Sequence, residues 1–191
     1  MIDVRPLGED TLEDLATLFE ADRVTRDCWC MWFITSVSAF HAAGEAGNRD
    51  AFVQLMAEDP HPLGLVAHAE GRPVGWCAVG PRSRFARAVK TPTFRNHAKA
   101  TSDEDEWLVP CFYVAPDARG RGVAAALLQA GIDAAKAAGA DAIAGFPLAG
   151  ERRRSSGDDF EVGVESLFAG CGFDIVDRPS SNRVVMRRGL R

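Results

Sequence analysis

The stretch from Val109 to Leu127, VPCFYVAPDARGRGVAAAL, constrains the fold of this chain more than any other. Its apolar first part, Val109 to Val114, has the composition of a buried strand and stops at Pro116-Asp117. A turn with two arginines and two glycines, Arg119 to Gly122, then leads into an alanine- and leucine-rich helix. The first turn of a helix has unpaired N–H groups and a positive dipole end, and glycine lets a ligand approach the backbone. The stretch therefore predicts a strand-turn-helix unit that binds phosphate groups.

The composition predicts one globular domain spanning residues 1–191, with 47% apolar and 26% charged residues. A net charge of −5 argues against a protein that coats nucleic acid, so an anionic ligand needs local basic groups. The N-terminus lacks the basic and apolar regions of a secretion signal, and no apolar run reaches the roughly 18 residues of a membrane span. Five cysteines, an odd number lying mostly in apolar runs, favour reduced thiols in the cytoplasm over a disulfide framework.

Hydrophobic periodicity along the chain predicts an α/β (α+β) fold, with a mixed sheet of about six to seven strands and helices on both faces. Strands are expected at 2–6, 63–69, 74–79, 109–114, 141–146, 173–177 and 183–186. Helices are expected at 10–20, from Ser36 or Ser38 to about 44, at 48–59 with Asn48 as N-cap, at 122–138 and at 162–169. The polar segment 81–105 is expected to be a long surface loop, with or without one short helix.

The order of these elements and the glycine-containing turn resemble the GNAT acetyltransferase superfamily. Arg119, Gly122 and Ala124 match its pattern of Gln or Arg, two residues, Gly, one residue, and Gly or Ala. The segment from Ser166 to Phe173 is similar to the family's junction between a short helix and a Gly-Phe pair. The resemblance extends from about residue 2 to 188. Further segments are similar to a bacterial branch of the family, namely Cys28-Trp29-Cys30-Met31, Gly75 to Pro81 and Cys111 to Val114.

The resemblance implies an N-acetyltransferase that uses acetyl-CoA as cosubstrate. The acceptor would be a primary amine of a small molecule or peptide, the transfer direct, and the protein a monomer or homodimer without nucleic-acid or membrane partners. The backbone of Phe112, Tyr113 and Val114 would pair with the pantetheine arm as a further strand does. The turn and helix start would hold the pyrophosphate through Arg119, Gly120, Arg121, Gly122, Val123, Ala124 and Ala125.

Pro110 disturbs the strand that precedes the turn, because proline has no N–H to donate to a neighbouring strand. A bulge is one expected consequence, together with a separation from the strand at Ala142–Phe146 that would admit a pantetheine arm. The alternative is that Pro110 only begins the strand.

The short helix departs from the family at the position of its usual proton donor. Many relatives carry a tyrosine five residues before the phenylalanine of the Gly-Phe pair, where this chain has Phe168. The family's frequent asparagine seven residues earlier corresponds to Glu161. The thiolate would then leave unassisted, or Tyr113 or a water would replace the missing acid, although core packing is the commoner role of a strand tyrosine. The alternative function is a non-catalytic acyl-CoA-binding regulatory protein on the same fold.

Glu106 is the first candidate for the general base, because relatives often draw a carboxylate from this region. The alternative is that the acidic run from Asp103 to Glu106 is only a solvated edge. The four carboxylates would favour a cationic amine over an acid as acceptor.

Several aromatic and sulfur side chains near the N-terminus have a second possible role. Trp29, Trp32 and Trp76 are candidates for lining an acceptor pocket, although core packing explains an aromatic cluster equally well. Cys28 and Cys30 form a C-x-C pair without a second Cys or His pair at ligand spacing, so no metal site is predicted.

Overall fold

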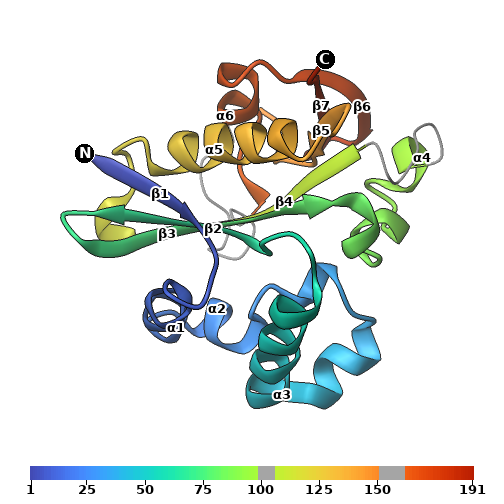
Figure 1. Ribbon diagram of the computed structural model, residues 1–191. Coiled ribbons are helices and arrows are strands. Elements are labelled where there is room, and N and C mark those ends of the chain that lie inside the picture. The colour runs from blue at the N-terminus through green and yellow to red at the C-terminus, as the bar shows by residue number, and fades with distance from the viewer. Residues whose placement is uncertain (99–105, 151–161) are drawn as a thin grey trace.

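The computed structural model describes residues 1–98, 106–150 and 162–191. The strands of these residues form one mixed sheet of seven in the order β1-β2-β3-β4-β5-β7-β6 (Figure 1). Neighbouring strands run antiparallel except β4 and β5, which are parallel. The strands are β1 (Ile2–Pro6), β2 (Gly64–Ala69), β3 (Arg72–Pro81), β4 (Glu106–Val114), β5 (Ala142–Gly145), β6 (Asp174–Ser180) and β7 (Arg183–Gly189). The predicted mixed α/β sheet is confirmed.

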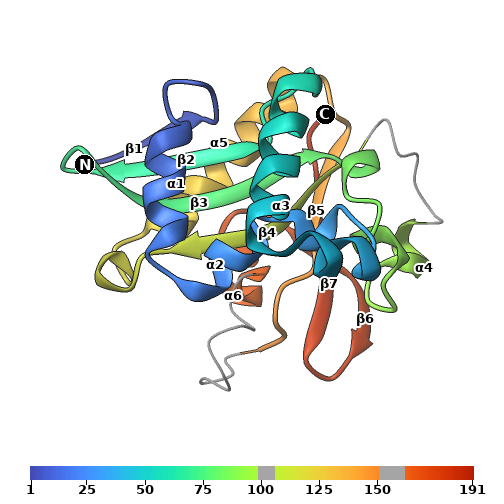
Figure 2. The ribbon, with the colours of Figure 1, turned by 90° about the horizontal axis from the view of Figure 1, so that it is seen from below.

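Helices cover both faces of the sheet, as Figure 1 and Figure 2 show. One face carries α1 (Leu12–Glu20), α2 (Arg23–Cys28) and α3 (Val37–Glu58), and the other carries α5 (Val123–Ala137) and α6 (Glu165–Gly170). The short α4 (Arg95–Ala98) lies near the start of β4. Short 3-10 turns are η1 (Met31–Phe33), η2 (Arg82–Arg84), η3 (Ala88–Lys90) and η4 (Pro116–Ala118). No helix in the described ranges has both the length and the apolarity to cross a bilayer.

The α3 region contains the two helices predicted for it, but the second begins before Asn48. Ser36 caps the helix as expected, since its hydroxyl accepts a hydrogen bond from the N–H of Ala39 at 3.2 Å. Within Val37–Glu58, two helices meet at a kink at Gly44, whose φ is 61°, and the predicted end of the first helix at about residue 44 is confirmed. The prediction of Asn48 as an N-cap is wrong. Asn48 lies inside the span, is buried, and donates a hydrogen bond to the carbonyl oxygen of Asp27 at 2.9 Å, which ties α3 to α2.

The described part of segment 81–105 is not the surface loop that its polar composition predicts. The turns η2 and η3 and helix α4 occupy it, and Arg82, Phe85, Ala88 and Phe94 are buried. Burial of these apolar side chains holds the segment against the sheet, and Arg82 is buried because it has an ionic partner on β4. Residues 99–105, with three of the four carboxylates of the acidic run, lie outside the described residues.

Candidate active site

The turn between β4 and α5 presents an open helix N-terminus. Gly120 and Gly122 have φ values of 74° and 83°, and no atom lies within 4 Å of a Cβ built on either of them. The first intrahelical bond runs from the N–H of Ala126 to the carbonyl of Gly122, so the N–H groups of Val123, Ala124 and Ala125 precede the helical ladder. The glycines are therefore required for backbone conformation, and the space beside them can hold an anion.

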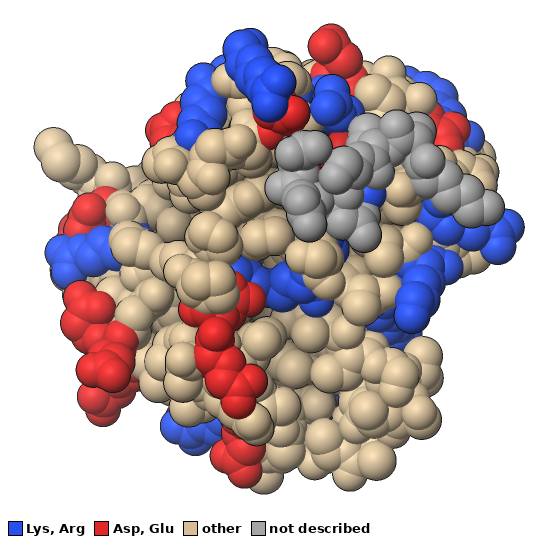
Figure 3. All heavy atoms as spheres, turned by 45° about the vertical axis from the view of Figure 1, so that its right-hand side comes forward, with Lys and Arg blue, Asp and Glu red and all other residues tan. Residues whose placement is uncertain are grey.

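The basic side chains of this turn lie at the surface. Arg119 and Arg121 are both exposed, and the Nε of Arg119 donates to the carbonyl oxygen of Val114 at 3.0 Å. That bond ties the turn to the end of β4. Figure 3 shows acidic and basic side chains interspersed on one face of the molecule, so recognition of a charged ligand depends on local groups such as these.

Strand β4 carries the bulge that Pro110 predicts. The register with β3 pairs Cys111 with Ala78 and Leu108 with Gly80, so three steps on β4 oppose two steps on β3. The extra residue also reverses the alternation of side chains. Val109 packs in the core layer of α5, whereas Cys111 and Tyr113 pack in the layer of α1–α3. Without the bulge, strand alternation would place all three side chains on one face.

Strands β4 and β5 separate directly after the bulge begins. Their parallel pairing ends at Leu108 and Ala144, and β5 itself ends at Gly145. On its other side β4 stays paired with β3 as far as Val114. Among the described residues, β4 is therefore not paired with β5 beyond Leu108. The predicted separation of the two strands is confirmed.

Phe168 fills the inner part of this separation. Its ring is fully buried and makes edge contacts with Phe112 and Phe173, with ring centroids 6.0 Å and 5.0 Å apart. A Cβ added to Gly145 would lie 2.4 Å from the Phe168 ring, and one added to Gly163 would lie 3.0 Å from it. The two glycines thus make room for the ring. The ring of Phe168 has no hydroxyl group and therefore cannot donate a proton, as expected from the phenylalanine at this position of the sequence.

Tyr113, the candidate acid, lies in the core layer beneath α1–α3. Tyr113 is 6% exposed and lies opposite Trp76 in the pairing of β3 with β4. Cys111 is also buried there, and its sulfur lies 3.7 Å from that of Cys30. Among the residues described, no group of three or more His, Cys, Asp or Glu side chains could hold a metal ion.

Glu106, the candidate base, is enclosed by basic groups at the start of β4. Glu106 is 1% exposed, and Nη1 of Arg82 donates a hydrogen bond to its Oε2 at 2.9 Å. Its Oε1 meets Nε2 of His97 at 3.0 Å and Nε of Arg187 at 3.2 Å. Burial disfavours the charged carboxylate, but the hydrogen bonds and charges of His97 and Arg82 outweigh burial and lower the pKa of Glu106. A low-pKa carboxylate with both oxygens occupied is poorly suited to accept a proton from an amine.

A pH titration of stability tests this description of Glu106. A carboxylate whose folded-state pKa is depressed stabilises the fold above its ordinary pKa, and that contribution is lost as pH falls through the folded-state value. We expect the melting temperature of the wild type to fall more steeply than that of Glu106→Gln between about pH 5 and pH 3. Parallel curves for the two proteins, measured by differential scanning fluorimetry, would contradict a depressed pKa.

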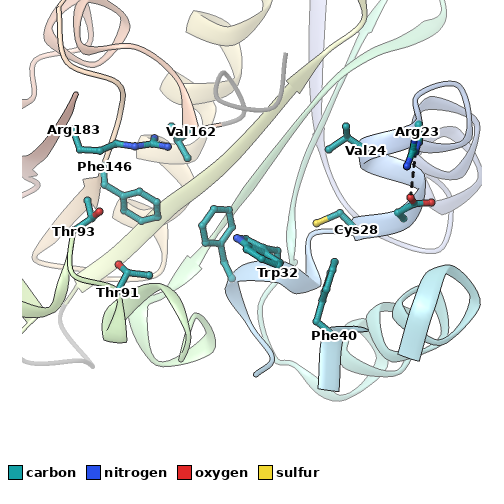
Figure 4. Close-up of a pocket in the computed structure, with 12 residues that line it drawn as sticks. Arg23, Val24, Cys28, Trp32, Phe40, Thr91, Thr93, Phe146, Val162 and Arg183 are labelled. Carbon is teal, nitrogen blue, oxygen red and sulfur yellow. Dashed lines mark ion pairs between the residues drawn. The ribbon is translucent and has the colours of Figure 1, made fainter. Parts of the chain in front are cut away.

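A cavity of about 780 Å³ lies on the α1–α3 face of the sheet, next to the point where β5 leaves β4 (Figure 4). Its aromatic walls are Trp32, Phe33, Phe40 and Phe146, and Phe146 directly follows the last residue of β5. Its polar groups are Arg23, Asp27, Cys28, Thr91, Thr93 and Arg183. The volume and the mainly apolar lining are typical of a small-molecule site.

Only one of the three candidate substrate-binding tryptophans lines this cavity. Trp32 does so, and the guanidinium of Arg87 lies 3.3 Å from its ring centroid. Trp29 and Trp76 are 1% and 0% exposed and pack against Phe19 and Phe52. The expected acceptor contact of Trp29 and Trp76 is therefore corrected to core packing, because buried side chains present no surface to a ligand.

The comparison with protein families decides the identity of the fold. Residues 22–147 match the model of the "Acetyltransferase (GNAT) family". The chain belongs to the GNAT family. Among similar solved structures are an agmatine N-acetyltransferase mutant in its apo form, an N-acetyltransferase from Staphylococcus aureus Mu50, and YncA from Salmonella typhimurium with acetyl-CoA.

These structures share the GNAT fold with this chain at low sequence identity. The identities are 16%, 15% and 13%, and the TM-scores 0.60, 0.58 and 0.57, in the order just given. Each alignment covers 100% of this chain, and it covers 100%, 99% and 94% of the three structures. No curated protein sequence matches the chain. The comparisons therefore establish the family and its fold.

Several cavity residues of this GNAT protein were not predicted from its sequence. Phe33 lies in the sequence Cys28-Trp29-Cys30-Met31-Trp32-Phe33, which is rich in aromatic and sulfur side chains, and Phe146 ends an apolar run, so a weak signal existed for both. No feature of the sequence around Arg183 indicated that it would line a cavity. It begins β7, and it reaches the cavity only because β7 inserts between β5 and β6 and bridges to Leu148.

Proposed function

We propose that the protein is an acetyl-CoA-dependent N-acetyltransferase that acetylates a primary amine of a small molecule or peptide by direct transfer in a ternary complex. The observation that carries this proposal is the open N-terminus of α5 together with the end of the β4–β5 pairing at Leu108. A further support is that YncA, which has a similar fold, was solved with acetyl-CoA. The assignment to a bacterial branch through Cys28-Trp29-Cys30-Met31, a single domain and a cytoplasmic location stay predictions.

The residues present fit the two parts of acetyl-CoA that need protein partners. The N–H groups of Val123, Ala124 and Ala125, with Arg121 nearby, suit a pyrophosphate. The backbone of Phe112 to Val114, beyond the end of the β4–β5 pairing, suits the amides of the pantetheine arm, which would add to β4 as a strand does. Acetyl-CoA supplies an activated acetyl thioester. The separation of β4 and β5 gives the thioester end access to the cavity beside Phe146.

The reaction replaces the C–S bond at the acetyl carbonyl carbon with a C–N bond. The neutral amine nitrogen forms a C–N bond, the C–S bond breaks, and the proton lost by nitrogen passes through water to the leaving sulfur or to solvent. Neither Glu106, which is held by basic groups, nor Phe168, which has no hydroxyl, suits the transfer of that proton. We propose that water carries it, so that the protein contributes chiefly by positioning the two substrates.

Substitution of Tyr113 tests the proposed role of water. We expect Tyr113→Phe to lower kcat by less than about tenfold, because a general acid typically contributes about 10²–10⁴-fold and this ring lies in the core. A steady-state assay of CoA thiol release measures kcat for the wild type and the variant. A loss of about 10²-fold or more, at unchanged melting temperature, would assign the acid to Tyr113 instead.

Two glycines at opposite ends of α5 provide a matched test of the phosphate site. Gly122 and Gly139 have φ values of 83° and 82°, and neither has an atom within 4 Å of an added Cβ. Alanine at either position should cost about 1–2 kcal/mol of stability because of the left-handed conformation. Only Gly122→Ala is expected to weaken acetyl-CoA binding, by about tenfold in Kd, since it disturbs the N–H groups of the first turn.

Isothermal titration calorimetry with acetyl-CoA checks this prediction for the wild type and both variants. Equal Kd values for Gly122→Ala and Gly139→Ala would contradict the placement of the pyrophosphate. Absence of binding to the wild type at millimolar acetyl-CoA would contradict the proposed function itself.

A further inference from the structure

Three partly exposed aromatic side chains meet in the cavity beside Phe146, and they indicate what its ligand must offer. Trp32, Phe33 and Phe40 line the cavity, and each is partly exposed, unlike the buried Trp29. Apolar rings at the surface of a cavity favour a ligand whose apolar body displaces water from them. We propose that the amine acceptor carries a bulky apolar or aromatic body, as an aralkylamine does. The inference rests on the proposed function and specifies its acceptor.

Contacts among the rings hold the walls of the cavity in place. The rings of Trp32 and Phe40 are in edge contact, with centroids 5.1 Å apart, and those of Phe33 and Phe146 are in edge contact at 5.6 Å. Phe146 is itself buried and packs on Phe94, with centroids 5.8 Å apart. Rings fixed by such contacts form a rigid apolar surface, which binds an apolar or aromatic body at low entropic cost.

The size of the cavity also favours a bulky acceptor. Its volume of about 780 Å³ lies in the range of sites that enclose a whole small molecule. A short aliphatic amine would leave most of this space to water, and the aromatic walls would stay hydrated. Binding would then gain little from the hydrophobic effect, which grows with the apolar area removed from water.

The charges around the cavity disfavour a second cation on the acceptor. The guanidinium carbon of Arg87 lies 3.3 Å from the centroid of the Trp32 ring, so a positive charge already lies against this wall. A cation bound at the same ring would be repelled by that charge. The carboxylate of Asp27, which lines the cavity, lies 3.9 Å from the guanidinium of Arg23 and 4.0 Å from that of Arg26. An apolar body therefore fits these surroundings better than a second ammonium group.

The position of the cavity orients such an acceptor. Phe146 directly follows β5, whose pairing with β4 has ended by this point. Under the proposed function the thioester carbonyl lies at this separation, so the amine points toward Phe146 and the apolar body toward Trp32 and Phe40. In Figure 4, Thr91 and Thr93 lie on the Phe146 side, where their hydroxyl groups can accept a hydrogen bond from the amine.

Two charged side chains that could have selected the acceptor are already engaged within the protein. Arg183 lines the cavity but has an interaction of its own, so the proposal does not depend on its charge. Glu106 pairs with Arg82, His97 and Arg187, so it offers little attraction to a further cation. We therefore assign the selection of the acceptor to the aromatic walls.

Three primary amines of similar basicity test the inference. Phenylpropylamine, with its ring on the carbon farthest from nitrogen, has an aromatic body. Propylamine lacks that body, and cadaverine carries a second cation in its place. With acetyl-CoA at saturation, we expect kcat/KM for phenylpropylamine to exceed that for each of the other two by about tenfold or more, the effect of burying one phenyl ring. Mass spectrometry of the products identifies the acetylated amine.

Variants on helix α3 assign the contact to Phe40. We expect Phe40→Ala to lower kcat/KM for phenylpropylamine by about tenfold and to leave that for propylamine within about threefold, because only the larger acceptor reaches this ring. Phe40→Leu keeps an apolar side chain and should retain part of the preference. Leu55→Ala, the matched control, should leave the ratio between the two substrates within about threefold. Leu55 is a partly buried residue of the same helix and is not among the described residues that line the cavity.

The outcomes separate this inference from the proposed function. A preference for phenylpropylamine below about tenfold over either other amine, or an unchanged ratio in a Phe40→Ala variant that melts as a folded protein, would overturn the inference and leave the acetyltransferase intact. Binding of acetyl-CoA without turnover of any amine would overturn both. Wild-type kinetics alone decide the first point, so the test does not depend on the stability of a variant.

Discussion

Replacement of Glu106 by glutamine is expected to lower the free energy of unfolding by about 3–5 kcal/mol, because it removes the negative charge that the buried Arg82 shares with His97 and Arg187. Arg82 and Glu106 are each 1% exposed in their side chains and lie 2.9 Å apart. His97 and Arg187 share the same carboxylate. The cluster joins η2, α4 and β7 to the first residue of β4. Its loss should also loosen the segment that brings Thr91 and Thr93 to the cavity.

Urea denaturation of the wild type and Glu106→Gln measures this difference, and Glu20→Gln is the matched control. Glu20 pairs with Arg49 at 3.3 Å, but both side chains are about half exposed, at 52% and 51%. An exposed pair of this kind contributes about 0–1 kcal/mol. A stability loss for Glu106→Gln no larger than that for Glu20→Gln would show that the cluster is not a structural anchor. A kcat loss without any stability loss would restore Glu106 as the candidate base.

The second large effect is expected at Phe168, whose ring lies between the separated strands. Phe168→Ala should lower the free energy of unfolding by about 3–5 kcal/mol, the usual range for removing a buried phenylalanine side chain. It should also raise KM for acetyl-CoA, because the ring packs on Phe112 and against Gly145, where the two strands part. Chemical denaturation and steady-state kinetics give the two quantities.

Phe173→Ala separates the effect on stability from the effect on the cosubstrate. Phe173 is also buried and packs on Phe168, with centroids 5.0 Å apart, but it is not among the atoms nearest to Gly145 or Gly163. We expect a similar loss of stability and a smaller rise in KM for acetyl-CoA. Equal changes in KM for the two variants would mean that Phe168 acts through general core packing and has no particular role at the strand separation.

The features that the sequence predicted well are local in the chain. The turn from Arg119 to Gly122 and the helix after it depend on neighbouring residues, so glycine placement and helical periodicity were sufficient. The bulge in β4 followed from the missing N–H of Pro110. The absence of a hydroxyl at Phe168 was visible directly.

The features that the sequence did not predict depend on contacts between distant segments. Glu106 meets Arg187 across 81 residues, and no local pattern distinguishes a carboxylate in such a cluster from a solvated one. Asparagine is a common N-cap residue, but Asn48 lies inside α3, where its side chain donates a hydrogen bond to the carbonyl of Asp27, 21 residues away. Arg183 reaches the cavity through the insertion of β7 into the sheet. Charge and cavity chemistry therefore required the assembled fold.

The most direct test of the central proposal is a product assay with the wild-type protein. Acetyl-CoA is incubated with the protein and a panel of primary amines, while free CoA thiol is titrated and products are identified by mass spectrometry. We predict equimolar release of CoA and formation of an N-acetylated amine, with no acetyl group left on the protein chain, as direct transfer requires. Binding of acetyl-CoA without thiol release above the protein-free rate for any amine would contradict the proposal and favour an acyl-CoA-binding regulatory protein.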